Sequence, residues 1–246
     1  MKMIFTIGFS LLMGLAISSR VQAEIFDDPQ NLEVLPDTIS PEALRETMKD
    51  FAMGTGQRCS DCHKGEAGAD LSTYDFASDE KELKQVARGM LKMVMAINDE
   101  YLESLGEDHT RVKCMTCHRG VKVPRMTQEV LTQAATKGGV NGLNKTYREM
   151  RERYYGTHSY DFSDMTLAGT ARGLMQSGNP EEAGAMLDLI LEDNPDSFNA
   201  NYLYGELSET QGDRQAALAY YRKAVEINPR AAPMLQPKLD ELSSPD

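Results

Sequence analysis

"CSDCH" at residues 59–63 and "CMTCH" at residues 114–118 use all four cysteines of this 246-residue chain in two copies of one pattern. Cys-x-x-Cys-His is the attachment signature of c-type haem. Two cysteines three positions apart lie on one side of a helical turn and reach the two vinyl groups at one edge of a porphyrin. The adjacent histidine then binds the iron. The sequence therefore predicts two covalent haems. The expected attachment residues are Cys59, Cys62, Cys114 and Cys117, and the expected proximal iron ligands are His63 and His118.

Three other uses of these two pentads explain the residues less well. A zinc ion would have to draw its ligands from both pentads or keep open positions. A redox-active Cys-x-x-Cys motif needs no histidine after it. A disulfide inside each pentad would leave the two histidines without a role. The histidines therefore favour haem and iron.

The chain begins with the pattern of a secretory signal peptide. Lys2 precedes an apolar run from Ile4 to Ile17, and Ala23 closes the segment. We expect residues 1–23 to be cleaved after Ala23, which exports the protein to the periplasm or another compartment outside the cytoplasm. A retained membrane anchor is the alternative, but the run is shorter than the roughly 20 residues that a spanning helix needs.

The formal net charge of −12 bears on possible partners. An acidic surface repels nucleic acids and favours proteins with basic docking surfaces. We therefore expect no nucleic-acid partner, and redox donors and acceptors that carry basic surfaces. A soluble secreted protein without such partners would have the same charge.

Helix signals follow a Pro- and Asp-rich segment, residues 24–39, which is expected to be an extended arm. Ser40 is a typical N-cap, Pro41 suits the first helical position, and Gly54 is expected to end this helix. A second helix is expected from a capping box of Asp79 and Glu82 to Gly106. Its apolar face consists of Leu83, Val86, Met90, Val94, Ile97 and Tyr101. Residues 40–127 are thus expected to form a small all-α cytochrome domain.

The second half of the chain is periodic. Gly178 and Gly212 are 34 residues apart, as are Pro195 and Pro229. This period resembles the tetratricopeptide repeat, a pair of antiparallel helices. We expect a helical linker over residues 128–163 and a tetratricopeptide-like domain over 164–246, used for docking, self-association or assembly, or to stabilise the first half. Signature residues of the second copy are Gly205, Ala217, Tyr221, Ala224 and Pro229.

Methionines on the two helices are candidates for the remaining iron positions. Met48 precedes Cys59 by 11 residues, and Met90 precedes Cys114 by 24. Each helix could return its methionine to the haem that follows it. Methionines on a helix face also fill cores, and the spacing does not separate Met90 from Met93.

Three segments carry a resemblance to a known family: "LRETMKDFAMGTGQRCSDCH" (44–63), "FASDEKELKQVARGMLKMVMAINDEYL" (76–102) and "VKCMTCHRGVKVPR" (112–125). They resemble half of the tetrahaem cytochrome subunit of photosynthetic reaction centres. That resemblance implies Met48 as the distal ligand of the first haem and Met90 as that of the second. Met53, Met93 and Met95 are second choices.

The chain also departs from this family. It has two pentads where the subunit carries four haems, and Ser104 stands where the family pattern supplies a histidine to a further haem. The tetratricopeptide-like half has no counterpart in that subunit. A photosynthetic role therefore does not follow from the resemblance.

His/Met ligation leaves no open iron position and favours one-electron transfer. The sequence thus predicts an exported dihaem cytochrome that carries electrons between proteins and is not an enzyme. The alternative is a peroxidase-like dihaem enzyme in which one distal ligand is labile.

Overall fold

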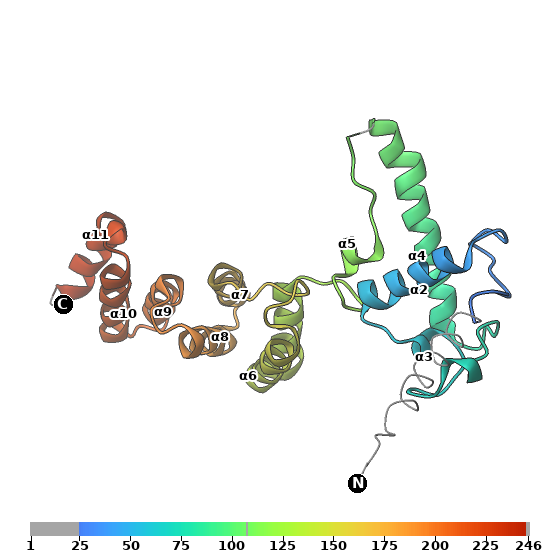
Figure 1. Cartoon of the computed structure of the whole chain (residues 1–246). Helices are drawn as coiled ribbons and strands as arrows, with labels where there is room; N and C mark the ends of the chain where they lie inside the picture. Colours follow the sequence, from blue (N-terminus) through green and yellow to red (C-terminus); the bar gives the residue numbers. More distant parts are fainter. Residues whose placement is uncertain (1–24, 107, 245–246) are drawn as a thin grey trace, which may run out of the picture. The chain divides into compact units, whose positions relative to one another are not determined.

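The computed structural model describes residues 25–106 and 108–244 (Figure 1), so the predicted signal peptide and its cleavage after Ala23 lie outside the described residues. The described chain contains helices, one isolated bridge between Lys64 and Asp75, and no β-strand, which confirms the all-α prediction. None of the helices in these two ranges is both long and apolar enough to cross a membrane. The chain divides into two compact units after Pro124.

Helix α2 (Pro41–Thr55) opens the first unit. The Ser40 hydroxyl accepts a hydrogen bond from the Ala43 backbone N–H at 3.2 Å, which confirms the predicted N-cap. Gly54 does not end the helix as predicted. Gly56 does so, in a left-handed conformation with φ of 69°. Gly54 instead lies against α5, where an added Cβ would stand 2.5 Å from the Cβ of Cys114.

Helix α4 (Glu82–Ala96) continues into a π-helical turn, η2 (Ile97–Leu102), and a 3₁₀ turn, η3 (Glu103–Leu105), before Gly106. The expected capping box at Asp79 is wrong, because Lys81 is the N-cap. The Asp79 carboxylate instead forms ion pairs at 3.0 Å with both Lys84 and Arg88. An aspartate just before a helix is a typical N-cap, and it can equally well form ion pairs. The sequence alone therefore does not distinguish the two roles of Asp79.

The two pentads form short helices, α3 (Cys59–Cys62) and α5 (Cys114–His118). A 3₁₀ turn, η1 (Leu71–Thr73), lies in the loop that joins α3 to α4. Helix α5 packs against α2, and α3 packs against α4. The two pentads are thus held by the two longer helices of the unit.

The segment before α2 is bound to α4. The Asn31 side chain donates a hydrogen bond to the Ala77 carbonyl at 2.7 Å, and the Arg88 guanidinium donates to the Asn31 carbonyl at 2.7 Å. Glu33 forms an ion pair with Arg88 at 3.0 Å. Asn31 and Glu33 both have positive φ, 62° and 45°, so this part of the predicted extended arm is turned.

The second unit is an array of helical hairpins. Its first helix, α6 (Thr127–Tyr154), bends sharply at Gly139, where φ is 58° and ψ is −153°. The five other helices are α7 (Asp164–Gln176), α8 (Pro180–Asp193), α9 (Phe198–Thr210), α10 (Arg214–Ile227) and α11 (Ala232–Ser243). A 3₁₀ turn, η4 (Pro229–Ala231), precedes α11.

The 34-residue period reappears in the backbone. Gly178 and Gly212 make the turns of the two hairpins with φ of 75° and 76°. Within the hairpin α9–α10 a small residue faces a large one, since a Cβ on Gly205 would stand 2.3 Å from the Tyr221 ring. Leu187, which replaces the aromatic residue in the first copy, is fully buried.

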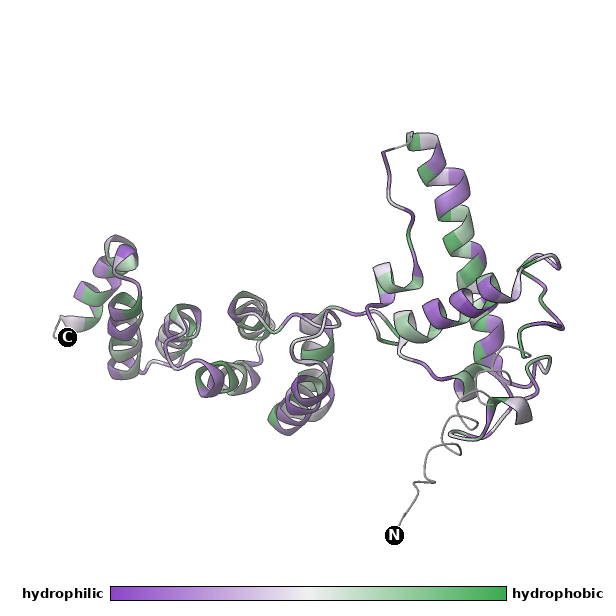
Figure 2. Ribbon diagram, viewed as in Figure 1, coloured by the Kyte–Doolittle hydropathy of each residue, from purple (hydrophilic) through white to green (hydrophobic). Residues whose placement is uncertain are grey.

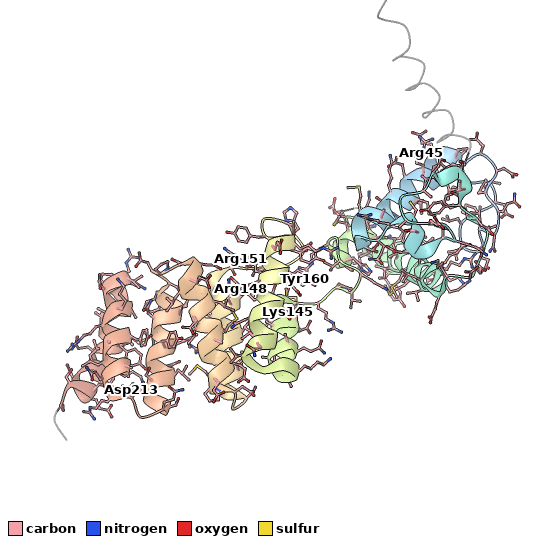
Figure 3. The ribbon with its side chains drawn as sticks, turned by 90° about the horizontal axis from the view of Figure 1, so that it is seen from below. Arg45, Lys145, Arg148, Arg151, Tyr160 and Asp213 are labelled. Carbon is pink, nitrogen blue, oxygen red and sulfur yellow. The ribbon has the colours of Figure 1, made fainter. Side chains whose placement is uncertain are left out.

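Two neighbours cover the ends of this pair of repeats. Helix α6 packs against α7 and α8, and α11 packs against α10. Part of the segment predicted as a linker therefore belongs to the core of the second unit, through Leu131, Leu143 and Tyr147. Arg148 and Arg151 of α6 pair with Glu192 and Asp193 of α8, at 2.8 and 3.2 Å (Figure 3). Because two repeats alone bury too little, these flanking helices complete the array.

Candidate functional site

His63 follows α3 and is half-buried. Its ring meets the Phe76 ring edge to face, with 5.0 Å between centroids. Burial lowers the pKa of His63, and the nearby Lys84 charge lowers it further. The Phe76 backbone opposes this shift, but its carbonyl already accepts a hydrogen bond from Lys84 Nζ at 2.9 Å. The buried Nδ1 has no hydrogen bond of normal geometry among the described residues. Burial and the Lys84 charge thus favour the neutral imidazole, which is the form that binds metals.

His118 ends α5 with a defined tautomer. Its Nδ1 lies 3.0 Å from the Val121 carbonyl, which only accepts, so Nδ1 carries the hydrogen. Nε2 then keeps its lone pair for a metal. At the start of the same pentad, the Lys113 backbone N–H donates to the Thr116 hydroxyl at 3.0 Å. This second histidine therefore meets the requirement for an iron ligand.

The four predicted attachment residues are all free thiols. Cys59 and Cys117 are exposed, whereas Cys62 and Cys114 are half-buried. Burial raises the pKa of both half-buried thiols. Each pentad thus presents one open and one sheltered thiol for a covalent bond.

The predicted distal ligands lie on the two long helices. Met48 on α2 is half-buried, and Met90 on α4 is 39% exposed. The second choices, Met53, Met93 and Met95, are also exposed. Because α2 packs on α5 and α4 packs on α3, each methionine-bearing helix packs on the pentad of the other predicted haem. The prediction pairs Met48 with His63 and Met90 with His118. One haem would then lie between α2 and α3 and the other between α4 and α5, and neither pair of elements is closely packed among the described residues.

The apolar face expected on α4 is only partly covered: Leu83, Val94 and Ile97 are half-buried. Val86 is 49% exposed and Tyr101 is 66% exposed, and Figure 2 shows hydrophobic residues along the whole of α4 and its extension. Within the described part of the first unit, only Leu44 and Val121 are buried hydrophobic residues. An apolar planar group suits such a face. Thiols, imidazoles and thioethers are also the donors that a c-type haem takes, so the residues fit this group.

Two buried cations in this unit were not singled out from the sequence. Lys84 Nζ donates to the carbonyls of three residues, Phe76, Ala77 and Ser78, at 2.9–3.0 Å. Arg88 joins the same loop to the N-terminal segment. Lys84 and Arg88 are one helical turn apart, and that spacing is the only sequence signal for the pair. They position the loop that carries Phe76 against His63.

Asn98 is a third residue that sequence reasoning missed. Its amide donates to the Val112 carbonyl at 2.9 Å and accepts from the Val112 N–H at 2.8 Å. The side chain is 4% exposed and lies in the π-helical turn η2. This pair of bonds fixes the returning chain two residues before Cys114. The signal that could have indicated it is a polar residue directly after the apolar run "VMAI" (94–97).

Comparison with known proteins gives two family matches. A family model for the photosynthetic reaction centre cytochrome c subunit matches residues 17–166, more than half of the chain. A tetratricopeptide-repeat model matches residues 169–232. Both resemblances noted in the sequence are thereby confirmed.

One similar protein is the probable biofilm formation methyltransferase WspC of Pseudomonas putida. It is 40% identical over 73 residues, which cover 30% of this chain and 17% of that protein. The likeness therefore concerns a short part of the longer protein.

Proposed function

The chain belongs to the family of the photosynthetic reaction centre cytochrome c subunit, and on this basis we propose that it is an exported electron carrier with two covalent haems. The haems attach at the cysteines of α3 and α5, with His63 and His118 as proximal ligands. Bound haem supplies an iron that gains and loses one electron. The observation that carries this proposal is the second pentad, where His118 Nδ1 donates to the Val121 carbonyl and leaves Nε2 free to bind.

Met48 and Met90 are the distal ligands in this proposal. Each methionine would supply a thioether as the remaining iron ligand, so the protein would transfer electrons and would not act on a substrate. The half-buried position of Met48 and the apolar, partly exposed face around Met90 support this choice. The chain itself supplies ligands, burial and orientation.

Export and partners complete the proposal. Residues 1–23 direct the chain out of the cytoplasm. Its thiols then meet haem outside the cytoplasm, during maturation. Redox donors and acceptors with basic surfaces dock on the acidic protein. The repeat unit serves docking or assembly, because arrays of this kind present extended binding surfaces.

The first experiment is intact mass spectrometry of protein secreted from a host that matures c-type cytochromes. We expect two haem additions and loss of residues 1–23. The oxidised protein should show the near-infrared methionine–iron band and no carbon monoxide binding once reduced. A single haem, or bound zinc, would contradict the proposal. Carbon monoxide binding at one haem would favour the peroxidase-like alternative.

Met90→Ala tests the distal assignment. We expect the methionine band to fall by about half, because one of two low-spin haems loses its thioether. Met93→Ala is the matched control on the same helix and should leave the band unchanged. The opposite pattern would transfer the role to Met93.

A further inference from the structure

The two proximal histidines differ in the hydrogen bond at Nδ1. His118 Nδ1 donates to the Val121 carbonyl at 3.0 Å. His63 Nδ1 is buried and has no hydrogen-bond partner of normal geometry among the described residues. A carbonyl that accepts a hydrogen bond from Nδ1 makes the imidazole a stronger electron donor to its metal. His118 is therefore the stronger donor of the two.

Lys84 binds the loop that packs on His63. The Phe76 ring lies against the His63 ring, with 5.0 Å between the centroids. The Phe76 carbonyl accepts a hydrogen bond from Lys84 Nζ at 2.9 Å, and the carbonyls of Ala77 and Ser78 accept from the same ammonium group at 3.0 and 2.9 Å. A cation thus occupies a carbonyl beside the ring whose own N–H has no such acceptor.

The positive charges of this region are more buried than the negative ones. The side chains of Lys84 and Arg88 are each 10% exposed, whereas their partners Asp79 and Glu33 are 36% and 49% exposed. Solvent screens the exposed carboxylates more strongly than the buried cations. Burial lowers the pKa of His63 most, and the two cations lower it further. His63 therefore lies in a positive field.

The other charges beside the first pentad are exposed and of mixed sign. Burial raises the pKa of the Cys62 thiol most, Asp61 raises it further, and Lys122 lowers it. Lys64 pairs with Glu80 at 2.7 Å. All four of these charged side chains are exposed. They therefore offset one another at the surface and leave the buried cations as the main source of the field at His63.

The second pentad has no such pair of cations. Lys84 and Arg88 are the only buried charged residues in the described part of the chain, and both lie on α4, which packs on α3. At the second pentad, burial raises the pKa of the Cys114 thiol, and the exposed Asp50 carboxylate raises it further. The largest charge effect on that thiol is therefore negative.

We propose that Lys84 gives the first haem, at Cys59 and Cys62, a higher reduction potential than the second haem. The inference rests on the proposed function, in which each iron has one histidine and one methionine, so the ligand types do not distinguish the two sites. A buried cation disfavours the oxidised iron, which carries one positive charge more than the reduced iron. The weaker donor His63 acts in the same direction, because a strong imidazole donor stabilises the oxidised iron.

This order determines where an electron resides within the unit. An electron shared by the two haems occupies the first one at least about ten times as often, which corresponds to about 59 mV between the two potentials. An acceptor that docks beside the first pentad then takes the electron without an uphill step. Lys84 is a positioning residue in this scheme, because it acts on the iron through its charge and through the loop that packs on His63.

Redox titration of the mature full chain, followed in the visible spectrum, tests this role. The wild-type protein should show two one-electron waves at least about 59 mV apart, a ten-fold difference in the ratio of reduced to oxidised haem. Lys84→Met should lower the upper wave by at least about ten-fold in that ratio, because a charge is lost and the Phe76 carbonyl becomes available to His63. The lower wave should move by less than about two-fold.

Two further variants separate the charge of Lys84 from a loosened loop. Lys84→Arg keeps a cation and N–H donors at this position and should retain most of the separation between the waves. Lys92→Met makes the same substitution at an exposed position of α4 and should leave the upper wave in place. The proposal would be overturned by equal shifts in Lys84→Met and Lys92→Met, or by an upper wave that Lys84→Met does not move.

Nuclear magnetic resonance of half-reduced wild-type protein assigns the waves without any substitution. The protein carries isotope-labelled histidine and is poised between the two waves, and the ring signals are assigned through their Overhauser contacts to Phe76 and Val121. We expect the paramagnetic shifts of His118 to persist and those of His63 to be lost. The reverse order, or a single unresolved wave, would overturn the proposal.

The haem count and the methionine–iron band separate this inference from the proposed function. Protein with fewer than two haems, or without that band, contradicts the proposed function and the order of potentials with it. Two His/Met haems with equal potentials, or with the reverse order, contradict only the role of Lys84 and leave the proposed function in place.

Discussion

The two units differ in what fills their interiors. Among the described residues, the first unit contributes two of the buried hydrophobic side chains and the second unit contributes 23. The first unit relies on buried polar residues, Lys84, Arg88 and Asn98, which bind backbone groups of loops. The second unit packs side chain against side chain between neighbouring helices. The second unit therefore contains its own core, whereas the first consists of anchored loops beside uncovered apolar faces.

This difference indicates how each unit gains stability. A chain that buries little apolar surface depends on a bound group, because binding to the folded state alone shifts the folding equilibrium. Of the 13 large hydrophobic residues that are exposed in the described part of the chain, nine lie in the first unit. We therefore expect loss of the bound group to destabilise the first unit and not the second, and loss of core side chains to destabilise the second. The following variants test this contrast.

Removing the attachment thiols should have the largest effect. With Cys59, Cys62, Cys114 and Cys117 all replaced by serine, we expect the first unit to be cleaved at least about ten-fold faster in limited proteolysis, because its open form is more populated. The second unit should remain as a resistant fragment that begins near Arg125. Equal resistance of the first unit with and without its thiols would remove the contrast between the units.

Leu187→Ala should affect only the second unit. Leu187 is fully buried between repeat helices, and such a truncation costs about 2–5 kcal/mol of unfolding free energy. We expect an earlier thermal transition for the repeat unit and an unchanged haem spectrum. Met165→Ala, at a side chain that is 77% exposed, is the control and should change stability by less than about 0.5 kcal/mol. A changed haem spectrum in L187A would show that the two units are not independent.

Gly54→Ala and Gly89→Ala should have opposite signs. A Cβ at Gly54 would stand 2.5 Å from Cys114 Cβ, so overpacking costs about 1–3 kcal/mol. A Cβ at Gly89 on α4 meets nothing within 4 Å, and alanine there should stabilise the helix by up to about 1 kcal/mol. Denaturant midpoints of the first unit measure both. Equal shifts would mean that α2 and α5 are not in tight contact.

Asp79→Asn should have the smallest effect on stability. The effect should be visible in how the stability of the first unit depends on pH. Arg88, then Lys84 and Asn31, hold the pKa of the Asp79 carboxyl well below its usual range. In the unfolded chain an aspartate has a pKa of about 3.9, so the lower pKa in the folded protein stabilises the fold at pH values above about 3.9. This stability is lost as the pH falls from about 3.9 towards the folded pKa. The variant should therefore be less stable near neutral pH and show a shallower loss in acid. Asp37→Asn is the control, and an identical pH profile for both variants would contradict the role of Asp79.

The sequence predicted elements whose signals are local. Ser40 and Pro41 begin α2 as expected, and the 34-residue spacing of Gly178 and Gly212 appears as two equal turns. These features depend on neighbouring residues or on a repeated pattern. They therefore require no knowledge of distant contacts.

The errors and omissions concern contacts between distant segments. Gly54 was expected to end a helix, but it is small because Cys114 lies against it. Asp79 was expected to cap a helix, but it pairs with Arg88 and Asn31. Asn98 binds Val112, 14 residues away. Such partners are set by the tertiary fold, so a single sequence does not indicate them. The placement of the distal ligands Met48 and Met90 stays a prediction.

The equal turns at Gly178 and Gly212 also bear on how this chain could change in length. Both glycines have the same left-handed conformation, so residues 178–211 form a unit that begins and ends at equivalent turns. A tandem duplication of those 34 residues would reproduce both turns and add one more hairpin before α11. The gene could therefore lengthen its second half in whole steps without altering a residue around either pentad.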